Sequence, residues 1–310
     1  MSQEAAERRM PAPRTPDGGR PAAASRPRRG VRPLRRRAVG SLLRHGVAWA
    51  LGLIWVIPFA GVAMSALRPQ EELLHGWWHL QPLTLSVDNF TRALDHPTAA
   101  IGQGLWNSLL VAIPGTLLPL LLGSLAAYGL LRSRSRARRP LLLAVVLLLA
   151  VPQQMVAVPL FRMMRDAGLI NSRTGLVLAH TAWALPWMIM FFRNYFATLP
   201  REVEEAALLD GASRWQVFVR VILPMSLPAL ASAAALQSTW VWNDFFLALI
   251  LIYRPDLLVA TQRIPLLRGQ FHVDWGLLSA ASVLVMAVPV LVFALLQRYY
   301  VKGLVGWTLK

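Results

Sequence analysis

Residues 199–224 read LPREVEEAALLDGASRWQVFVRVILP and place a run of charged residues between two apolar stretches. Pro200 suits the first position of a helix, because its ring presets φ and its missing N–H would have no partner there. Glu202, Glu204 and Glu205 then fall in the first turn or so, where the helix dipole favours anions. The sequence therefore predicts a helix that begins near Pro200.

A second helix is expected directly after the first. Gly211 supplies the stop, because glycine readily takes the left-handed conformation that ends many helices. Ser213 and Gln216 form the S-x-x-Q pattern of a capping box, which marks the start of the next helix. Pro224 ends or kinks that helix. Segment 199–224 is thus predicted to be a helix–turn–helix. From physics alone, an amphipathic connector lying on lipid headgroups is an equally good interpretation.

Apolar stretches flank this segment on both sides, and each is long enough to cross a bilayer, which takes about 20 mostly apolar residues. Of the 310 residues, 55% are hydrophobic and 15% are charged, whereas soluble proteins carry about 25% charge. Helices are favoured because backbone groups in lipid must be hydrogen-bonded within their own segment. We therefore expect an all-α membrane protein with six transmembrane helices, at roughly 45–67, 105–130, 140–161, 175–196, 225–252 and 277–297.

The basic residues are unevenly distributed between the two sides of these spans. Of the 32 Lys and Arg residues, 24 lie in the segment up to Arg44, in 132–139, in 193–220 and in 298–310, and the other three connections hold eight. Cytoplasmic segments of membrane proteins collect Lys and Arg, so both termini and the segment 199–224 are predicted to be cytoplasmic. Topology and contact with anionic membrane lipid thus account for the net charge of +17, and nucleic acid is not an expected partner.

The helix–turn–helix also carries a family pattern. The residues E-A-A at 205–207, G at 211 and V-x-L-P at 221–224 resemble the EAA loop of binding-protein-dependent ABC import permeases, which usually has Ile in place of Val221. In that family the loop is a coupling helix that docks in a cleft of the ATP-binding subunit. The resemblance assigns coupling to Glu205, Ala206, Ala207, Asp210, Gly211, Leu223 and Pro224.

Other motifs narrow the resemblance. N-S-L at 107–109, A-A-Y at 126–128, W-N-D-F at 242–245 and Q-R-Y-Y-V-K-G-L at 297–304 look like the carbohydrate-uptake branch, in particular the maltose-type second permease subunit. The resemblance implies the type I importer permease fold and three kinds of partner: a second permease subunit, two ATP-binding subunits and an extracellular solute-binding protein. The last residues, 306–310, depart from the usual family ending.

The chain is accordingly divided into four parts. A disordered basic tail is expected at 1–40, and the first span with an extracellular loop at 41–103. The core ABC transmembrane domain, with spans two to six and the coupling loop, is expected at 104–297. A cytoplasmic tail is expected at 298–310.

Polar and aromatic residues inside the spans are candidates for the translocation path. Asn243 and Asp244 lie in the fifth span, where an acid is expensive and usually faces the bundle interior or a watery cavity. Hydrogen bonds between helices are the alternative role for this pair. Trp242 and Trp240 could stack on a sugar ring or pack against a neighbouring helix. Lesser candidates are Gln153, Gln154 and His180.

The residue types argue against an enzyme. The chain has no cysteine, no phosphate-binding G-x-x-x-x-G-K-[ST] loop and no pattern typical of a catalytic triad or metal cluster. No catalytic residue, metal ligand or cofactor is expected, and a partner must supply the ATPase. Three alternatives remain. One is a secondary transporter driven by an ion gradient, in which Asp244 and His180 would carry protons or bind cations. The others are an ABC permease for a non-sugar solute and a membrane scaffold.

Overall fold

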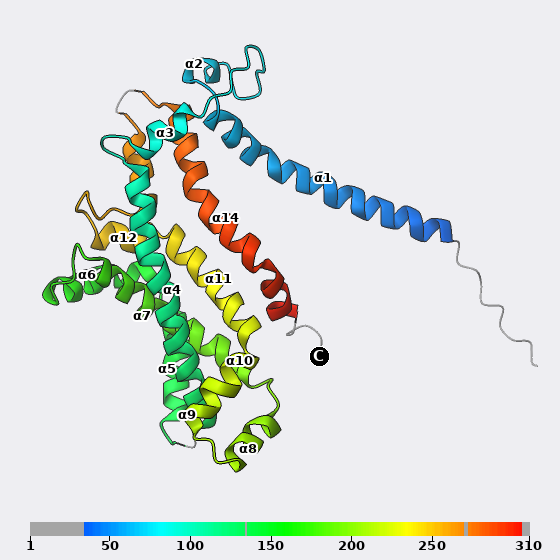
Figure 1. Ribbon diagram of the computed structural model, residues 1–310, viewed down its shortest axis with the longest axis vertical. Coiled ribbons are helices and arrows are strands. Elements are labelled where there is room, and N and C mark those ends of the chain that lie inside the picture. Colours follow the sequence, from blue (N-terminus) through cyan, green and yellow to red (C-terminus); the bar gives the residue numbers. More distant parts are fainter. Residues whose placement is uncertain (1–33, 134, 270–271, 306–310) are drawn as a thin grey trace, which may run out of the picture. The chain divides into compact units, whose positions relative to one another are not determined.

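The computed structural model describes residues 34–133, 135–269 and 272–305, and the regular elements among them are helices (Figure 1). The chain divides into two compact units between Trp55 and Val56. Helix α1 (Leu34–Ala66) begins in the first unit and ends in the second. It starts inside the range 1–40 that we expect to be a tail, and the first 33 residues of that tail lie outside the described residues.

Four helices form the frame of the second unit: α4 (Ile101–Arg132), α7 (Arg173–Phe196), α11 (Leu227–Asn243) and α14 (Trp275–Val305). Helix α4 packs along α7, and α11 packs against both α4 and α14. The short helices α2 (Gln70–Leu73) and α3 (Asp88–Leu94) lie at one end of this frame. Helices α8 (Arg201–Leu209) and α9 (Arg214–Val217) lie at the other end (Figure 1).

Four of the six predicted spans are continuous helices of sufficient length and apolarity, at Leu43–Ala66, Ile101–Arg132, Arg173–Phe196 and Trp275–Gln297. Two bent helix pairs are also long and apolar enough when each pair is taken together. The described residues therefore hold four spans, or up to six if each bent pair counts as one span, by length and composition. The third and the fifth predicted spans therefore correspond to bent helix pairs rather than to single continuous helices.

The third predicted span, 140–161, is broken. Helix α5 (Arg138–Leu149) stops, and a 3-10 turn, η1 (Gln153–Val156), leads into α6 (Ala157–Asp166). The two parts are bent by 100°. Pro152 stands at the break with an extended backbone (ψ 135°). Its ring removes a donor from the helix and keeps the preceding residue from continuing the helix comfortably.

The fifth predicted span, 225–252, is interrupted twice. The π-helical turn η2 (Phe218–Ile222) and α10 (Leu223–Met225) follow α9, and the chain then bends by 76° into α11. Helix α11 ends at Asn243, Asp244 is extended (ψ 131°), and α12 (Phe246–Leu251) begins after it. The last short turns before α14 are α13 (Ala260–Arg263) and η3 (Ile264–Leu267).

The N-S-L motif fastens the loop around α13 to the start of α4. The Asn107 amide donates to the Leu258 carbonyl at 3.0 Å, and the Ser108 hydroxyl accepts the Ala260 N–H at 2.9 Å. Arg263, which is buried, donates to the Ala99 carbonyl at 2.8 Å. This end of the unit is therefore held by side chains that satisfy buried backbone groups, as buried polar groups require.

Candidate functional site: the loop helices and a central cavity

The segment 199–224 forms the predicted helix–turn–helix. Gly211 has φ +86° just beyond the end of α8, so it ends the helix in the left-handed conformation. The Ser213 N–H donates to Gln216 Oε1 at 2.7 Å, and the Gln216 N–H donates to Ser213 Oγ at 3.3 Å. Both bonds of the expected capping box are therefore present.

The residues assigned to coupling do not all lie on one surface. Glu205, Ala206, Asp210 and Gly211 are exposed on α8 and its turn, and Ala207 is half-buried against the core. The other two, which lie in α10, are half-buried (Leu223) and exposed (Pro224). The exposed face of α8 is thus the part of this set that is accessible to another protein.

Two large apolar side chains accompany this face. Leu209 is 89% exposed and Trp215 is 60% exposed. Exposed apolar groups at the end of a helical unit, next to a charged helix, are typical of a surface that binds another protein. The α8 end therefore presents exposed apolar side chains beside charged ones.

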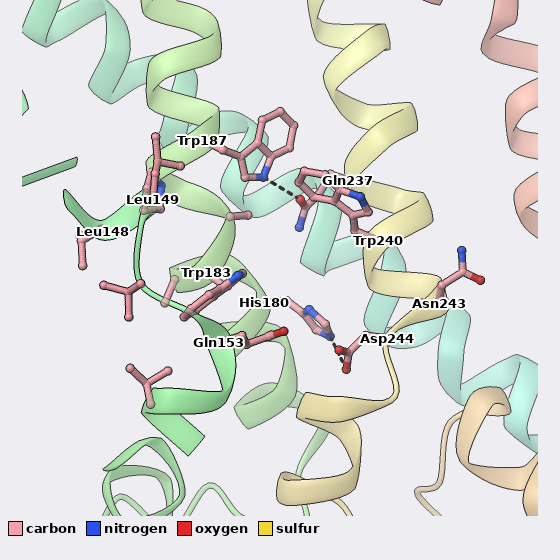
Figure 2. Close-up of a pocket in the computed structure, with 15 residues that line it drawn as sticks. Leu148, Leu149, Gln153, His180, Trp183, Trp187, Gln237, Trp240, Asn243 and Asp244 are labelled. Carbon is pink, nitrogen blue, oxygen red and sulfur yellow. Dashed lines mark hydrogen bonds and ion pairs between the residues drawn. The ribbon is translucent and has the colours of Figure 1, made fainter. Parts of the chain in front are cut away.

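A cavity of about 600 Å³ lies between α7, α11 and the broken third span (Figure 2). The α7 wall contributes an imidazole and two indoles, and the α11 wall contributes two amides and an indole. Residues 148–156 supply mainly aliphatic side chains. The labelled lining residues in Figure 2 are Leu148, Leu149, Gln153, His180, Trp183, Trp187, Gln237, Trp240, Asn243 and Asp244.

Polar groups in the cavity wall are positioned by contacts between helices. The Trp187 indole N–H donates to Gln237 Oε1 at 3.3 Å, and the Gln237 amide donates to the Gly115 carbonyl of α4 at 3.2 Å. His180 is buried, and its Nε2 lies 3.8 Å from Asp244 Oδ2 (Figure 2). The wall therefore combines flat aromatic surfaces with hydrogen-bonding groups.

The residues of the W-N-D-F motif have different surroundings: some line the cavity, and one packs between helices. Asn243 and Asp244 line the cavity. The Trp242 side chain lies outside the cavity, because its indole N–H donates to the Val285 carbonyl of α14 at 2.9 Å and the residue is buried there. Trp240 lines the cavity in its place, with its ring 5.1 Å from that of Trp187 in an edge-to-face arrangement.

Among the lesser candidates, Gln153 and His180 line the cavity, and Gln154 is exposed outside it. Sequence reasoning missed Trp183, Trp187 and Gln237. A signal was available for them, since an amide and two indoles in the fourth and fifth spans are as unusual in an apolar stretch as His180 is.

With this geometry in place, comparison with known proteins identifies the family. The sequence pattern of the family described as binding-protein-dependent transport system inner membrane component matches residues 120–306. The chain belongs to this family. The protein is accordingly a permease, a component of a transport system, with multiple apolar helices in the inner membrane.

Relatives of the permease include proteins named as transport permeases. A probable ABC transporter permease protein of Pyrococcus horikoshii is 53% identical over 269 residues, which cover 87% of this permease and 98% of that protein. The trehalose/maltose transport system permease protein MalG of Thermococcus litoralis is 34% identical over 227 residues, which cover 73% of this permease and 81% of that protein.

The fold of the permease is also found in a solved structure. A chain in the crystal structure of a bacterial ABC transporter involved in the import of the acidic polysaccharide alginate superposes with a TM-score of 0.75 at 22% identity. The match covers 86% of this permease and 98% of that chain. The expected type I importer permease fold is thus confirmed at the level of the fold.

Proposed function

We propose that this permease forms half of the membrane path of an ATP-driven importer for short oligosaccharides or related glycosides. The observation that carries the proposal is the cavity between α7 and α11 (Figure 2). Trp183, Trp187 and Trp240 offer aromatic faces to the apolar faces of a sugar ring, and Gln153 and Gln237 offer amides to its hydroxyl groups. The trehalose/maltose relative from Thermococcus litoralis supports this substrate class.

The energy for import comes from partner subunits. The chain contains no phosphate-binding G-x-x-x-x-G-K-[ST] loop, so we assign ATP hydrolysis to two ATP-binding subunits that dock on the exposed face of α8. Leu209 in α8 and Trp215 in α9 are exposed as well as Glu205 and Ala206, which suits a partly apolar interface. The basic residues around α8 and at both termini support a cytoplasmic location for these parts.

Two further partners complete the transporter. A second, related permease subunit closes the cavity and makes the path a heterodimer. An extracellular solute-binding protein delivers the substrate at the opposite end of the unit, where α2 and α3 lie (Figure 1). Closure of the ATP-binding pair moves the docked α8 helices, and the spans then rock between outward-open and inward-open states.

Uptake by purified components tests this function. Liposomes are prepared with the permease, its second subunit and the ATP-binding pair. Radiolabelled maltose, trehalose or maltotriose is added with the binding protein on the side of α2 and α3, and ATP is supplied on the side of α8. We expect uptake that requires both ATP and the binding protein and that persists when an ionophore dissipates ion gradients. Uptake that follows the ion gradient without ATP would overturn the proposal in favour of a secondary transporter.

A further inference from the structure

One acidic residue of α8 faces the opposite way from its neighbours. Glu202 and Glu205 are exposed, whereas Glu204 is 7% exposed. Its Oε1 accepts the Tyr128 hydroxyl at 2.8 Å, and its Oε2 pairs with Arg132 Nη2 at 2.6 Å. Both partners belong to the last turns of α4, so a carboxylate of the loop is bound to the end of a membrane helix.

This arrangement gives each oxygen of the buried carboxylate its own partner on α4. A carboxylate removed from water is stable only when its charge and lone pairs are matched, and the loss of one partner leaves an uncompensated buried charge. The Arg132 guanidinium supplies the charge and the Tyr128 hydroxyl supplies a hydrogen bond to the other oxygen. Helix α8 therefore has one well-defined position relative to the end of α4.

Tyr128 also contacts the second half of the loop. Its ring lies 5.2 Å from that of Phe218 in η2, and Phe218 in turn lies 5.9 Å from Trp215. The segment from η2 leads through α10 into α11. The end of α4 is thus held by both parts of the loop, and a displacement of α8 acts on α4 and α11 together.

Helix α4 reaches the cavity through close packing. A Cβ atom at Gly123 would lie 2.6 Å from the Cβ atom of Met188 in α7, so the two backbones are nearly in contact. Further along α4, the Gly115 carbonyl accepts the amide of Gln237, which holds Trp187 in the cavity wall. Tightly packed helices transmit a shift as a unit because their interiors are close to incompressible.

We propose that Glu204, Tyr128 and Arg132 form a clamp that transmits the movement of α8 to α4 and so positions the cavity wall during each ATP cycle. The three are positioning residues, since they lie away from the cavity and from the exposed face of α8. The proposal rests on the proposed function, and it adds a specific consequence: without the clamp, ATP is hydrolysed but less solute is moved for each ATP.

Two conservative substitutions test the clamp in the reconstituted complex. Y128F removes the hydroxyl and keeps the ring on Phe218, and E204Q removes the charge that pairs with Arg132. We expect the number of solute molecules taken up per ATP to fall at least fivefold in each variant, while the ATPase rate stays within twofold of the wild type. The matched control is D256N, because Asp256 pairs with Arg254 at the same 2.6 Å in an exposed loop, and its ratio should not change.

A thiol rescue separates transmission from folding. The natural chain has no cysteine, so the two engineered thiols of the double variant Y128C/E204C are the only thiols of the permease. With cysteine-free partners, a short bis-methanethiosulfonate, which forms a disulfide with each thiol and releases methanesulfinate, should raise the lowered uptake-to-ATP ratio at least threefold. Variants with one engineered thiol should not respond.

The outcomes distinguish the two proposals. If the wild-type complex shows no ATP-dependent uptake, the proposed function fails. If the wild type transports, and the assembled Y128F and E204Q variants take up as many solute molecules per ATP as the wild type, the clamp alone is overturned. Loss of assembly in all variants, or a crosslinked pair that stays uncoupled, overturns it as well, because the three residues would then only maintain the fold.

Discussion

Asp244 lies 3.8 Å from His180 across the edge of the cavity, and the same carboxylate caps the short helix α12. It accepts the N–H of Leu247 at 3.4 Å and that of Ala248 at 3.1 Å. A side-chain oxygen that accepts the first free N–H groups of a helix stabilises the helix start. Asp244 therefore stabilises the start of α12 and also lines the cavity that we propose as the path, whereas the sequence offered hydrogen bonds between helices as its alternative role.

Substitution at Asp244 separates these roles. In D244N the amide oxygen can still accept one of the two capping bonds of α12, but the negative charge 3.8 Å from His180 is lost, so uptake should fall about tenfold, which corresponds to about 1.4 kcal/mol. Protein level and thermal unfolding should stay near wild type. D244A should also cost about 1 kcal/mol of stability through the lost cap. Normal uptake by D244N would restrict Asp244 to capping.

A second prediction concerns Gly211, whose φ of +86° ends α8. Proline holds φ near −65° and has no N–H, so G211P also removes the bond from the Gly211 N–H to the Leu208 carbonyl, which is 3.1 Å long. We expect G211P to insert and assemble but to uncouple ATP hydrolysis from solute uptake. G211N is the matched control, because asparagine tolerates the left-handed conformation and an added Cβ would meet nothing within 4 Å. Normal uptake by G211P would contradict docking through α8.

The loop was predictable because its chemistry is local. Pro200 precedes the first residue of α8, Gly211 follows its end, and the pair Ser213 and Gln216 caps the start of α9, all within a few residues. The clamp was not predictable in the same way. Tyr128 was noted as part of a motif, but its partner Glu204 is 76 residues further along the chain, and periodicity does not indicate which acidic residue of α8 turns inward.

The cavity depends on tertiary structure in another way. Successive residues of an α-helix are rotated by about 100°, so Trp240 and Trp242 point to nearly opposite faces of α11. The packing of α14 decides which face of α11 lines the path, because the Val285 carbonyl of α14 accepts the indole N–H of Trp242. The break at Asp244 is not predictable from the sequence either, because a single acidic residue in an apolar stretch is also compatible with a continuous span.

The contact between α4 and α7 gives a stability prediction. In G123A the new Cβ atom would lie 2.6 Å from the Cβ atom of Met188, so the helices must separate. Overpacking of this kind costs about 1–3 kcal/mol, which should appear as a lower thermal unfolding midpoint in detergent. G129A on the same helix is the control, since its Cβ would meet nothing within 4 Å, and it should be neutral or slightly stabilising. Equal midpoints for the two variants would argue against close α4–α7 packing.

The two tryptophans of α11 should separate transport from stability. Trp240 is 56% exposed beside Trp187 in the cavity, so W240A should leave the unfolding midpoint nearly unchanged and lower the uptake rate at saturating binding protein about fivefold, the loss expected for one aromatic contact. W242F removes the N–H that donates to the Val285 carbonyl, so it should cost about 1 kcal/mol of stability and leave uptake per folded complex unchanged. The opposite pattern, with normal uptake in W240A and impaired uptake in W242F, would place the path on the other face of α11, towards α14.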